Sequence, residues 1–250
     1  MVSRRSILKM ATATTGGLLF AGSLQANENM SAGNKKLKVL VVGAHPDDPE
    51  TGAGGTIRKY TEANHEVVVL YFTRGEAGIP GISHEEAAKI RTSEANKACT
   101  IMKSRSIFFG QIDGSTVITP EWYDKMNQVL TDEKPDMIFT HWPIDTHRDH
   151  RICSNLVYDA WLHSGRKAAL YYFEVCTGAQ TQNFQPTHFV DISPVIQKKW
   201  DSCFTHESQK IRENYPADHA KMELFRGIEC NAAYAEAFIH HWLSPDGFLP

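Results

Sequence analysis

Residues 37–48 read LKVLVVGAHPDD, a β-branched apolar run that leads directly into a polar turn. A short continuous apolar run of this kind is typical of a strand that is buried on both faces of a parallel sheet. The turn brings one imidazole and two carboxylates, those of His45, Asp47 and Asp48, to the carboxyl end of that strand. Because ligands of open α/β sheets bind at this end of the strands, we expect the chemistry of the protein there.

Apolar runs alternate with segments of helical pattern along the rest of the chain. Further strands are predicted at residues 66–72, 106–109, 137–140, 169–174 and 188–192. Helices are predicted at residues 54–63, 83–101, from 119 onward, 149–162, 194–210 and 218–242. This alternation predicts an α/β fold, a Rossmann-like doubly wound, mostly parallel sheet with helices on both faces.

The first 26 residues have the pattern of an export signal peptide. Residues 3–9, SRRSILK, precede a mildly apolar stretch that is too short to span a bilayer as a stable helix. The paired arginines resemble a twin-arginine signal, and a generic secretion signal is the alternative. We therefore divide the chain into a signal peptide (1–26), a linker (27–35) and a single domain (36–250). The protein is expected to be periplasmic or otherwise exported, with no stable membrane span after signal cleavage.

The composition is that of an ordinary soluble globular protein, with 42% hydrophobic and 22% charged residues among 250. The formal net charge is −3. Three of the 26 basic residues and none of the acidic ones lie in residues 1–26, so the remainder carries 23 basic against 29 acidic residues, a charge of about −6. Since an acidic protein attracts neither nucleic acid nor an anionic membrane, neither is expected as a partner.

The five cysteines are widely spaced, and no two of them form a CxxC pair. This spacing excludes a zinc ribbon and a dithiol redox motif. A protein that folds before export closes its core with reduced thiols, so buried free thiols are favoured. One or two disulfide bridges are the alternative, because oxidising compartments permit them.

A second polar segment, HRDH at residues 147–150, follows the predicted fourth strand. In a doubly wound sheet the first and fourth strands are neighbours where the strand order reverses, and ligands lie at their carboxyl ends. The topology therefore brings two segments about a hundred positions apart into one crevice. Together they supply the imidazoles and carboxylates that a catalytic zinc needs. Either segment alone would more often be a helix N-cap or a surface loop.

Four other polar residues fit two interpretations. His141 and Asp145 lie between the fourth strand and His147, and they either face the crevice or are ordinary loop residues. Glu174 is more typical of a helix cap or a surface charge than of a substrate contact. His206 is more typical of a solvated or core histidine than of a metal ligand.

The motifs resemble those of the PIG-L/LmbE-like family of N-acetylglucosaminyl deacetylases. AHPDDPE at residues 44–50 is similar to the family's AHPDDxE box, and GGTI at 54–57 and TRGEAG at 73–78 match its next two motifs. DTHRDH at 145–150 is similar to its second metal segment. Ser208-Gln209 and YAEAF at 234–238 resemble its C-terminal signatures.

The resemblance implies a zinc ion held by His45, Asp48 and His150, with Fe²⁺ or Co²⁺ as metals that such a site accepts as well. It implies that Asp47 is the general base, and that His147 stabilises the oxyanion and protonates the departing amine. Asp149 would not bind the metal but would hydrogen-bond to a histidine ligand and so orient its ring.

Arg74 matches a family position that reaches the substrate, and a capping arginine is the alternative. The resemblance implies a zinc-dependent hydrolase that removes an acetyl group from the amide nitrogen of an N-acetylglucosamine-type sugar or glycoconjugate. The partner is then a small glycan substrate.

Two other classes of function fit the sequence less well. A non-catalytic periplasmic sugar- or metal-binding protein on the same scaffold has no need of a base such as Asp47 beside the ligands. A Rossmann-type nucleotide binder is disfavoured, because Gly43 is followed by AHP and not by the GxGxxG pattern. The sequence does not specify the natural substrate or the oligomeric state.

Overall fold

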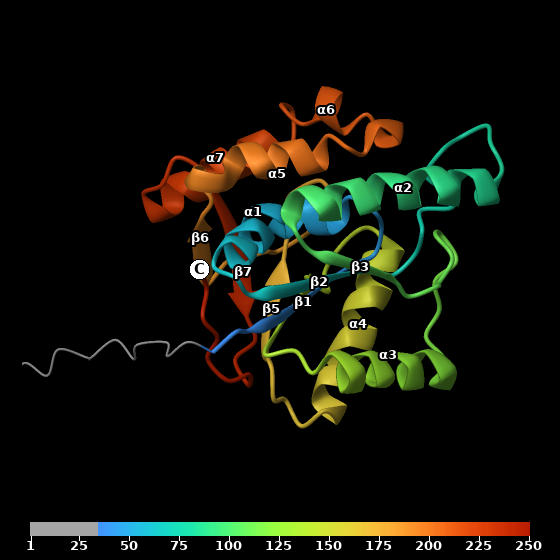
Figure 1. The fold of residues 1–250 in the computed structure, drawn as a ribbon, viewed down its shortest axis with the longest axis horizontal. Helices are drawn as coiled ribbons and strands as arrows, with labels where there is room; N and C mark the ends of the chain where they lie inside the picture. Colours follow the sequence, from blue (N-terminus) through green and yellow to red (C-terminus); the bar gives the residue numbers. More distant parts are fainter. Residues whose placement is uncertain (1–34) are drawn as a thin grey trace, which may run out of the picture. The chain divides into compact units, whose positions relative to one another are not determined.

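The computed structural model describes residues 35–250, of which Lys36–Pro250 form one compact unit. The predicted signal peptide, and the linker up to residue 34, lie outside the described residues. A sheet in the order β3-β2-β1-β4-β5-β7-β6 forms the centre of this unit (Figure 1). The strands are β1 (Lys38–Gly43), β2 (Glu66–Tyr71), β3 (Arg105–Phe108), β4 (Met137–His141), β5 (Ala169–Phe173), β6 (His188–Asp191) and β7 (Ala235–His240).

The strand order confirms the predicted doubly wound, mostly parallel sheet. β1 pairs in parallel with β2 on one side and with β4 on the other, so the order reverses between β1 and β4. β3 and β5 extend the parallel part. β7 is antiparallel to both of its neighbours, β5 and β6. The carboxyl ends of β1 and β4 therefore lie side by side, as the sequence predicted.

Helices cover both faces of the sheet (Figure 1). α1 and α2 pack on one face with α5 against them, and their core includes Ile57, Tyr60 and Ala95. α3 and α4 pack on the other face around Met126 and Leu156. The helices are α1 (Asp48–Glu62), α2 (His84–Met102), α3 (Pro120–Glu133), α4 (Arg148–His163), α5 (Ile196–Cys203), α6 (Ile211–Asn214) and α7 (His219–Cys230), with short 3₁₀ turns at Ser193–Val195 and Glu207–Gln209.

The C-terminal helix predicted for residues 218–242 was wrong in its second half. α7 ends at Cys230, after which Asn231 adopts a left-handed conformation with φ 60°. Residues Ala235–His240 then form β7, although alanine and glutamate favour helices. The segment is inserted between β5 and β6, and the hydrogen bonds of that pairing outweigh its local preference.

Two further boundaries differ from the predictions. α1 begins at Asp48 and not at residue 54, so the polar turn passes directly into the helix. The helix predicted for 194–210 is a single α-helix only over Ile196–Cys203.

All five cysteines are free thiols, as favoured from the sequence, but only Cys99, Cys153 and Cys203 are buried, while Cys176 and Cys230 are partly exposed. Among the described residues, no helix is long and apolar enough to cross a membrane.

Candidate metal centre

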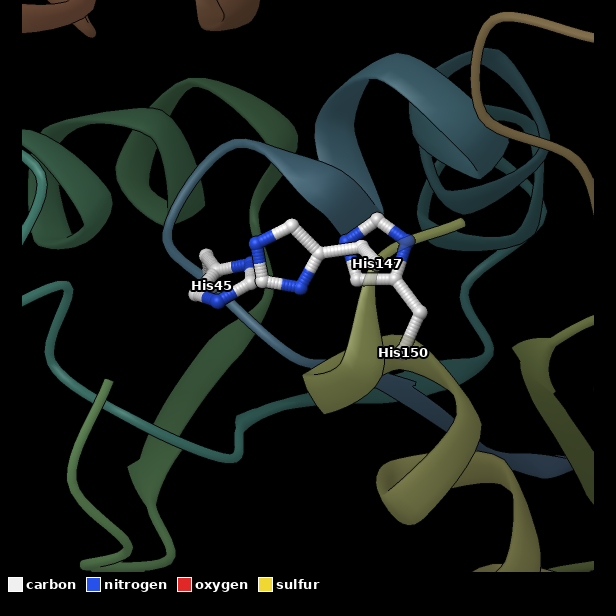
Figure 2. Close-up of side chains that lie close together, drawn as sticks. All are labelled: His45, His147 and His150. Carbon is white, nitrogen blue, oxygen red and sulfur yellow. The ribbon is translucent and has the colours of Figure 1, made fainter. Parts of the chain in front are cut away.

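The two polar segments meet at the carboxyl edge of the sheet. His45 lies two residues beyond β1, and Asp48 is the first residue of α1. His150 lies in the first turn of α4, and His147 directly precedes that helix. Figure 2 shows the rings of the three histidines close together, and the ring centre of His147 is 4.6 Å from that of His45 and 4.7 Å from that of His150.

The carboxylate of Asp48 lies between two imidazoles. Its Oδ2 is 3.1 Å from Nδ1 of His45, and its Oδ1 is 3.4 Å from Nε2 of His150. All three side chains are buried. Three overlapping sets of donor atoms in this cluster are close enough together to hold an ion: His45, His147 and His150; Asp48, His141 and His150; and His45, Asp113 and Asp149.

In His45 and in His150, the ring nitrogen that does not face Asp48 faces another carboxylate. Nε2 of His45 is 3.2 Å from Asp113 and 3.3 Å from Asp149, and Nδ1 of His150 is 3.3 Å from Asp145. Metal-ligating histidines commonly donate their second N–H to a carboxylate in this way, which fixes the ring and makes the free nitrogen more basic. Each of the predicted ligands His45, Asp48 and His150 belongs to at least one of the donor sets that could hold an ion, although no single set contains all three.

The supporting carboxylates are themselves fixed by hydrogen bonds. Asp149 accepts from the Gly114 N–H at 2.7 Å and from the Thr116 hydroxyl at 2.6 Å. Burial opposes ionisation, but the hydrogen bonds from His45 and Thr116 hold the pKa of Asp149 well below its ordinary value. Asp149 thus remains an anion behind His45.

Asp145 has the corresponding place behind His150. It accepts hydrogen bonds from the His147 N–H at 2.7 Å and from the Thr181 hydroxyl at 3.0 Å. Burial alone would lower the pKa of His150, but Asp48 and Asp145 raise it to about 9. Asp145, which the sequence left open between two interpretations, is therefore part of the site.

His141 forms the buried wall behind the cluster. Its ring stacks on that of His150, with the centres 4.0 Å apart, and its Nε2 accepts the Ala44 N–H at 2.9 Å. Burial, followed by the nearby His150, lowers the pKa of His141 to about 4. A neutral ring that accepts from the backbone fixes the end of β4 against the chain that leaves β1.

His147 presents one ring nitrogen as a donor. Its Nδ1 accepts the Asp149 N–H at 3.2 Å at the start of α4, so the hydrogen of the neutral ring lies on Nε2. Burial, together with the neighbouring His45 and His150, lowers the pKa of His147 and favours this neutral form.

Asp47 has an unusual backbone conformation. Its φ is 116°, a region that costs free energy for any residue with a Cβ. Arg91 donates to its carboxylate at 2.9 Å, and the Asp47 N–H donates to Glu50 at 3.2 Å. Burial raises the pKa of Asp47 to about 6, and the Arg91 charge opposes that shift. Asp47 therefore stays beside the ligand cluster while its carboxylate pairs with an arginine.

Glu50 is itself held in the core. It accepts a hydrogen bond from the Tyr71 hydroxyl, and Nε2 of His206 lies 3.4 Å from its Oε1. Glu50 and His206 are both completely buried. His206, expected to be a solvated or core histidine, is thus a core histidine that supports the turn holding Asp47.

The TRGEAG loop makes room for Arg91. A Cβ atom at Gly75 or at Gly78 would lie 2.4 Å from a guanidinium nitrogen of Arg91, and Gly75 also has a φ of +69°. A side chain at either position would force the buried guanidinium to move, and at Gly75 it would also strain the backbone. The sequence did not point to Arg91, because nothing in a helical segment indicates which groups the guanidinium of an arginine will contact in the folded chain.

We expect Arg91→Lys to lower kcat by about tenfold to a hundredfold, because a small displacement of a catalytic group has an effect of that size. The shorter ammonium loses the geometry that holds both Asp47 and the Pro46 carbonyl. Steady-state kinetics and metal analysis provide the measurement, with Arg105→Lys, on the surface-exposed start of β3, as the matched control. A variant with unchanged kcat would show that Arg91 does not position Asp47.

A cavity of about 490 Å³ opens beside the cluster. It is lined by residues of the two polar segments and by Arg91, Asp113, Gln180, Gln209 and His219, among others. Sequence reasoning missed Asp113 and His219. Neither belongs to the two segments, and they reach the cavity only because of the chain fold.

The two residues considered from the sequence for contact with substrate, Arg74 and Glu174, do not line this cavity. Arg74 pairs with Glu76 at 3.1 Å, is about half exposed, and borders a separate groove along α2. Glu174 forms a two-pronged ion pair with Arg226, with distances of 2.6 and 2.8 Å. It thereby anchors α7 to the end of β5.

The chain is similar in sequence to known deacetylases. Residues 40–161 match the family described as PIG-L, GlcNAc-PI de-N-acetylase. The diacetylchitobiose deacetylase of Thermococcus kodakarensis is 31% identical over 192 residues, which cover 70% of this chain and 71% of the relative.

Two solved structures share the fold. The N,N′-diacetylchitobiose deacetylase of Pyrococcus horikoshii has a TM-score of 0.73 at 23% identity, over 83% of this chain and 86% of its own. GalB of Pseudomonas putida, a 4-carboxy-2-hydroxymuconate hydratase, has a TM-score of 0.74 at 22% identity, over 86% of this chain and all of its own. Because a hydratase has the same fold, the fold alone does not define the reaction.

The chain thus has a doubly wound α/β sheet with a candidate metal centre where β1 and β4 end. The chain belongs to the PIG-L family, and it is an N-deacetylase, a hydrolase of an amide carbon–nitrogen bond.

Proposed function

We propose that the protein is a zinc-dependent N-deacetylase that removes the acetyl group from an N-acetylglucosamine-type sugar or glycoconjugate. One observation carries this proposal: His45, Asp48 and His150 line the same cavity as Asp47. The carboxylate of Asp47 belongs to none of the donor sets that could hold an ion. The relatives named as diacetylchitobiose deacetylases support the sugar as substrate. The cavity volume of about 490 Å³ is in the range of small-molecule sites, roughly 300–1,000 Å³.

In this proposal His45, Asp48 and His150 hold the metal, and Asp149 and Asp145 orient the two histidines. When bound, zinc would acidify a water molecule and polarise the amide carbonyl. Asp47 accepts the proton of the water that attacks the carbonyl carbon. Arg91 keeps the Asp47 carboxylate in place during this step.

His147 completes the proposed reaction. Its Nε2–H donates a hydrogen bond to the carbonyl oxygen as that oxygen becomes anionic. The neutral His147 ring keeps this hydrogen, so the nitrogen takes the proton that Asp47 accepted, and not one from His147 as the resemblance implied, when the carbon–nitrogen bond breaks and acetate and the free amine are released. Arg74, assigned to substrate binding by resemblance, would have to reach the glycan beyond this cavity.

The purified, zinc-loaded protein is expected to release acetate from N-acetylglucosamine glycans, in amounts equal to the free amine formed. A screen of N-acetylated sugars from one to four units, with acetate and amine measured in parallel, tests this. Glycan binding without release of acetate would contradict the proposal and favour a non-catalytic binding protein. Activity that survives complete removal of metal would contradict the zinc-dependent reaction.

We also propose that residues 1–26 direct export by a twin-arginine route to the periplasm, that residues 27–35 form a linker, and that residues 36–250 are the deacetylase domain. The motif SRRSILK at residues 3–9 supports this. Replacing Arg4 and Arg5 with lysine is expected to retain the protein in the cytoplasm, as measured by cell fractionation. Unchanged export would contradict the twin-arginine route.

A further inference from the structure

A second cavity, of about 570 Å³, lies beside α4 near the end of β7. It shares no lining residue with the cavity of about 490 Å³ beside the metal centre, which we call the catalytic cavity. The segment that follows β5 contacts both cavities: Gln180 lines the first, and the Gln182 carbonyl accepts the indole N–H of Trp142, which lines the second, at 3.1 Å. The proposed deacetylation makes no use of this second cavity.

Aromatic rings form much of the lining. Trp142 and Tyr172 meet edge to face, with ring centres 5.6 Å apart, and the ring of Tyr158 lies 5.3 Å from that of His241. Trp242 also borders the cavity, and its side chain is 82% exposed. Tryptophan is normally among the more buried residues, so an exposed indole at the mouth of a cavity indicates a surface that contacts a ligand.

The remaining lining combines the apolar Pro143 and Ile239 with polar side chains, and it carries no carboxylate, ammonium or guanidinium group. Asn155 provides an exposed amide, and the Ser154 hydroxyl is buried without a hydrogen-bond partner. Burial lowers the pKa of His241 and so favours its neutral ring. A lining of this chemistry selects an uncharged ligand that has both an apolar face and hydroxyl or amide groups.

We propose that this cavity is a second carbohydrate site, which binds a neutral pyranose ring of a glycan at a distance from the catalytic cavity. The C–H face of the ring would lie on an indole, and its hydroxyl or acetamido groups would bond with Asn155 and Ser154. The choice of an N-acetylated sugar as ligand rests on the proposed function. The cavity volume again lies within the range of small-ligand sites, roughly 300–1,000 Å³.

A second copy of the chain is the rival occupant, because exposed aromatic residues are also common at protein interfaces. A hollow whose aromatic and apolar lining also contains uncharged hydrogen-bonding groups, one of them without a partner, favours a small ligand with an apolar face and polar groups over a flat protein surface. The test therefore includes the oligomeric state.

The five tryptophans allow a direct measurement. The probe is N,N′,N″-triacetylchitotriose, titrated into the full chain carrying Asp47→Asn to stop turnover, while the indole N–H signals are followed by NMR. The signals of Trp142 and Trp242 are expected to shift and saturate. Those of Trp122 and Trp200, which lie outside the cavity, serve as internal references.

Trp242→Ala is expected to weaken the binding that the Trp142 signal reports by about tenfold, equivalent to ~1.4 kcal/mol. Leu243→Ala, an exposed neighbour that does not line the cavity, is the matched control and should bind as before. Because Trp242 is exposed, its replacement leaves the core intact.

Indole signals that stay unmoved at saturating trisaccharide would overturn the second site. So would a Trp242→Ala variant that binds normally but changes oligomeric state in light scattering, because the surface would then be an interface between copies. Failure of the wild-type protein to release acetate would reject the deacetylase proposal alone, since the indole shifts do not depend on turnover.

Discussion

Asp47→Asn is expected to retain bound metal and to lose about a thousandfold in kcat, the size of effect that a positioned general base supplies. The asparagine amide has nearly the shape of the carboxylate, but it cannot take a proton from water. Asp47 is not among the residues close enough to share an ion with the cluster, so the ligands are untouched. The measurement is acetate release, with metal content determined on the same preparation.

The matched control for this variant is Asp132→Asn, which alters an exposed carboxylate on α3 and should keep full activity. An Asp47→Asn protein that had lost its metal would mean that the roles of Asp47 and Asp48 are not divided as proposed. An active Asp47→Asn protein would mean that another group serves as the base.

His150→Ala is expected to abolish both metal binding and activity, a loss of at least about a thousandfold in turnover. The substitution removes one proposed ligand, and it also leaves the buried Asp48 and Asp145 carboxylates without their shared partner. Zinc content and acetate release are measured before and after treatment with a chelator. Zinc added afterwards should restore the wild-type protein and not the variant.

His163→Ala provides the control, because His163 is an exposed histidine at the other end of the same helix, α4. It should bind metal and turn over substrate like the wild type. Retention of zinc by His150→Ala at wild-type occupancy would show that another set of donors, such as His45 with Asp113 and Asp149, holds the ion.

The architecture of the sheet could be predicted because its signals are local. β1 and β4 contain short, largely apolar runs that are followed by polar turns, and such runs favour a buried strand. β7 could not be predicted, since alanine and glutamate favour a helix and only pairing with β5 and β6 makes the segment extended. Its side chains pack on neighbours that are distant in the sequence.

Within the site, the motifs predicted which segments meet but not which side chains reach the reaction centre. Arg74, inside a recognisable motif, pairs with Glu76, whereas Arg91, which no motif marked, reaches Asp47. Whether a long side chain points into a cavity depends on which loop closes over it, and here Gly75 and Gly78 admit the guanidinium of Arg91.

The residues at 44–50 and 145–150, by themselves, determined that imidazoles and carboxylates would stand at the ends of two neighbouring strands. This follows from the apolar runs that predict the strands and from the order of the strands in a doubly wound sheet, both of which can be derived from the sequence pattern. Only the tertiary structure decided that Asp149 supports His45 while Asp145 supports His150, and that Asp47 has a φ of 116°. These details depend on contacts between distant segments, and the energy of those contacts, unlike local propensity, exists only in the folded chain.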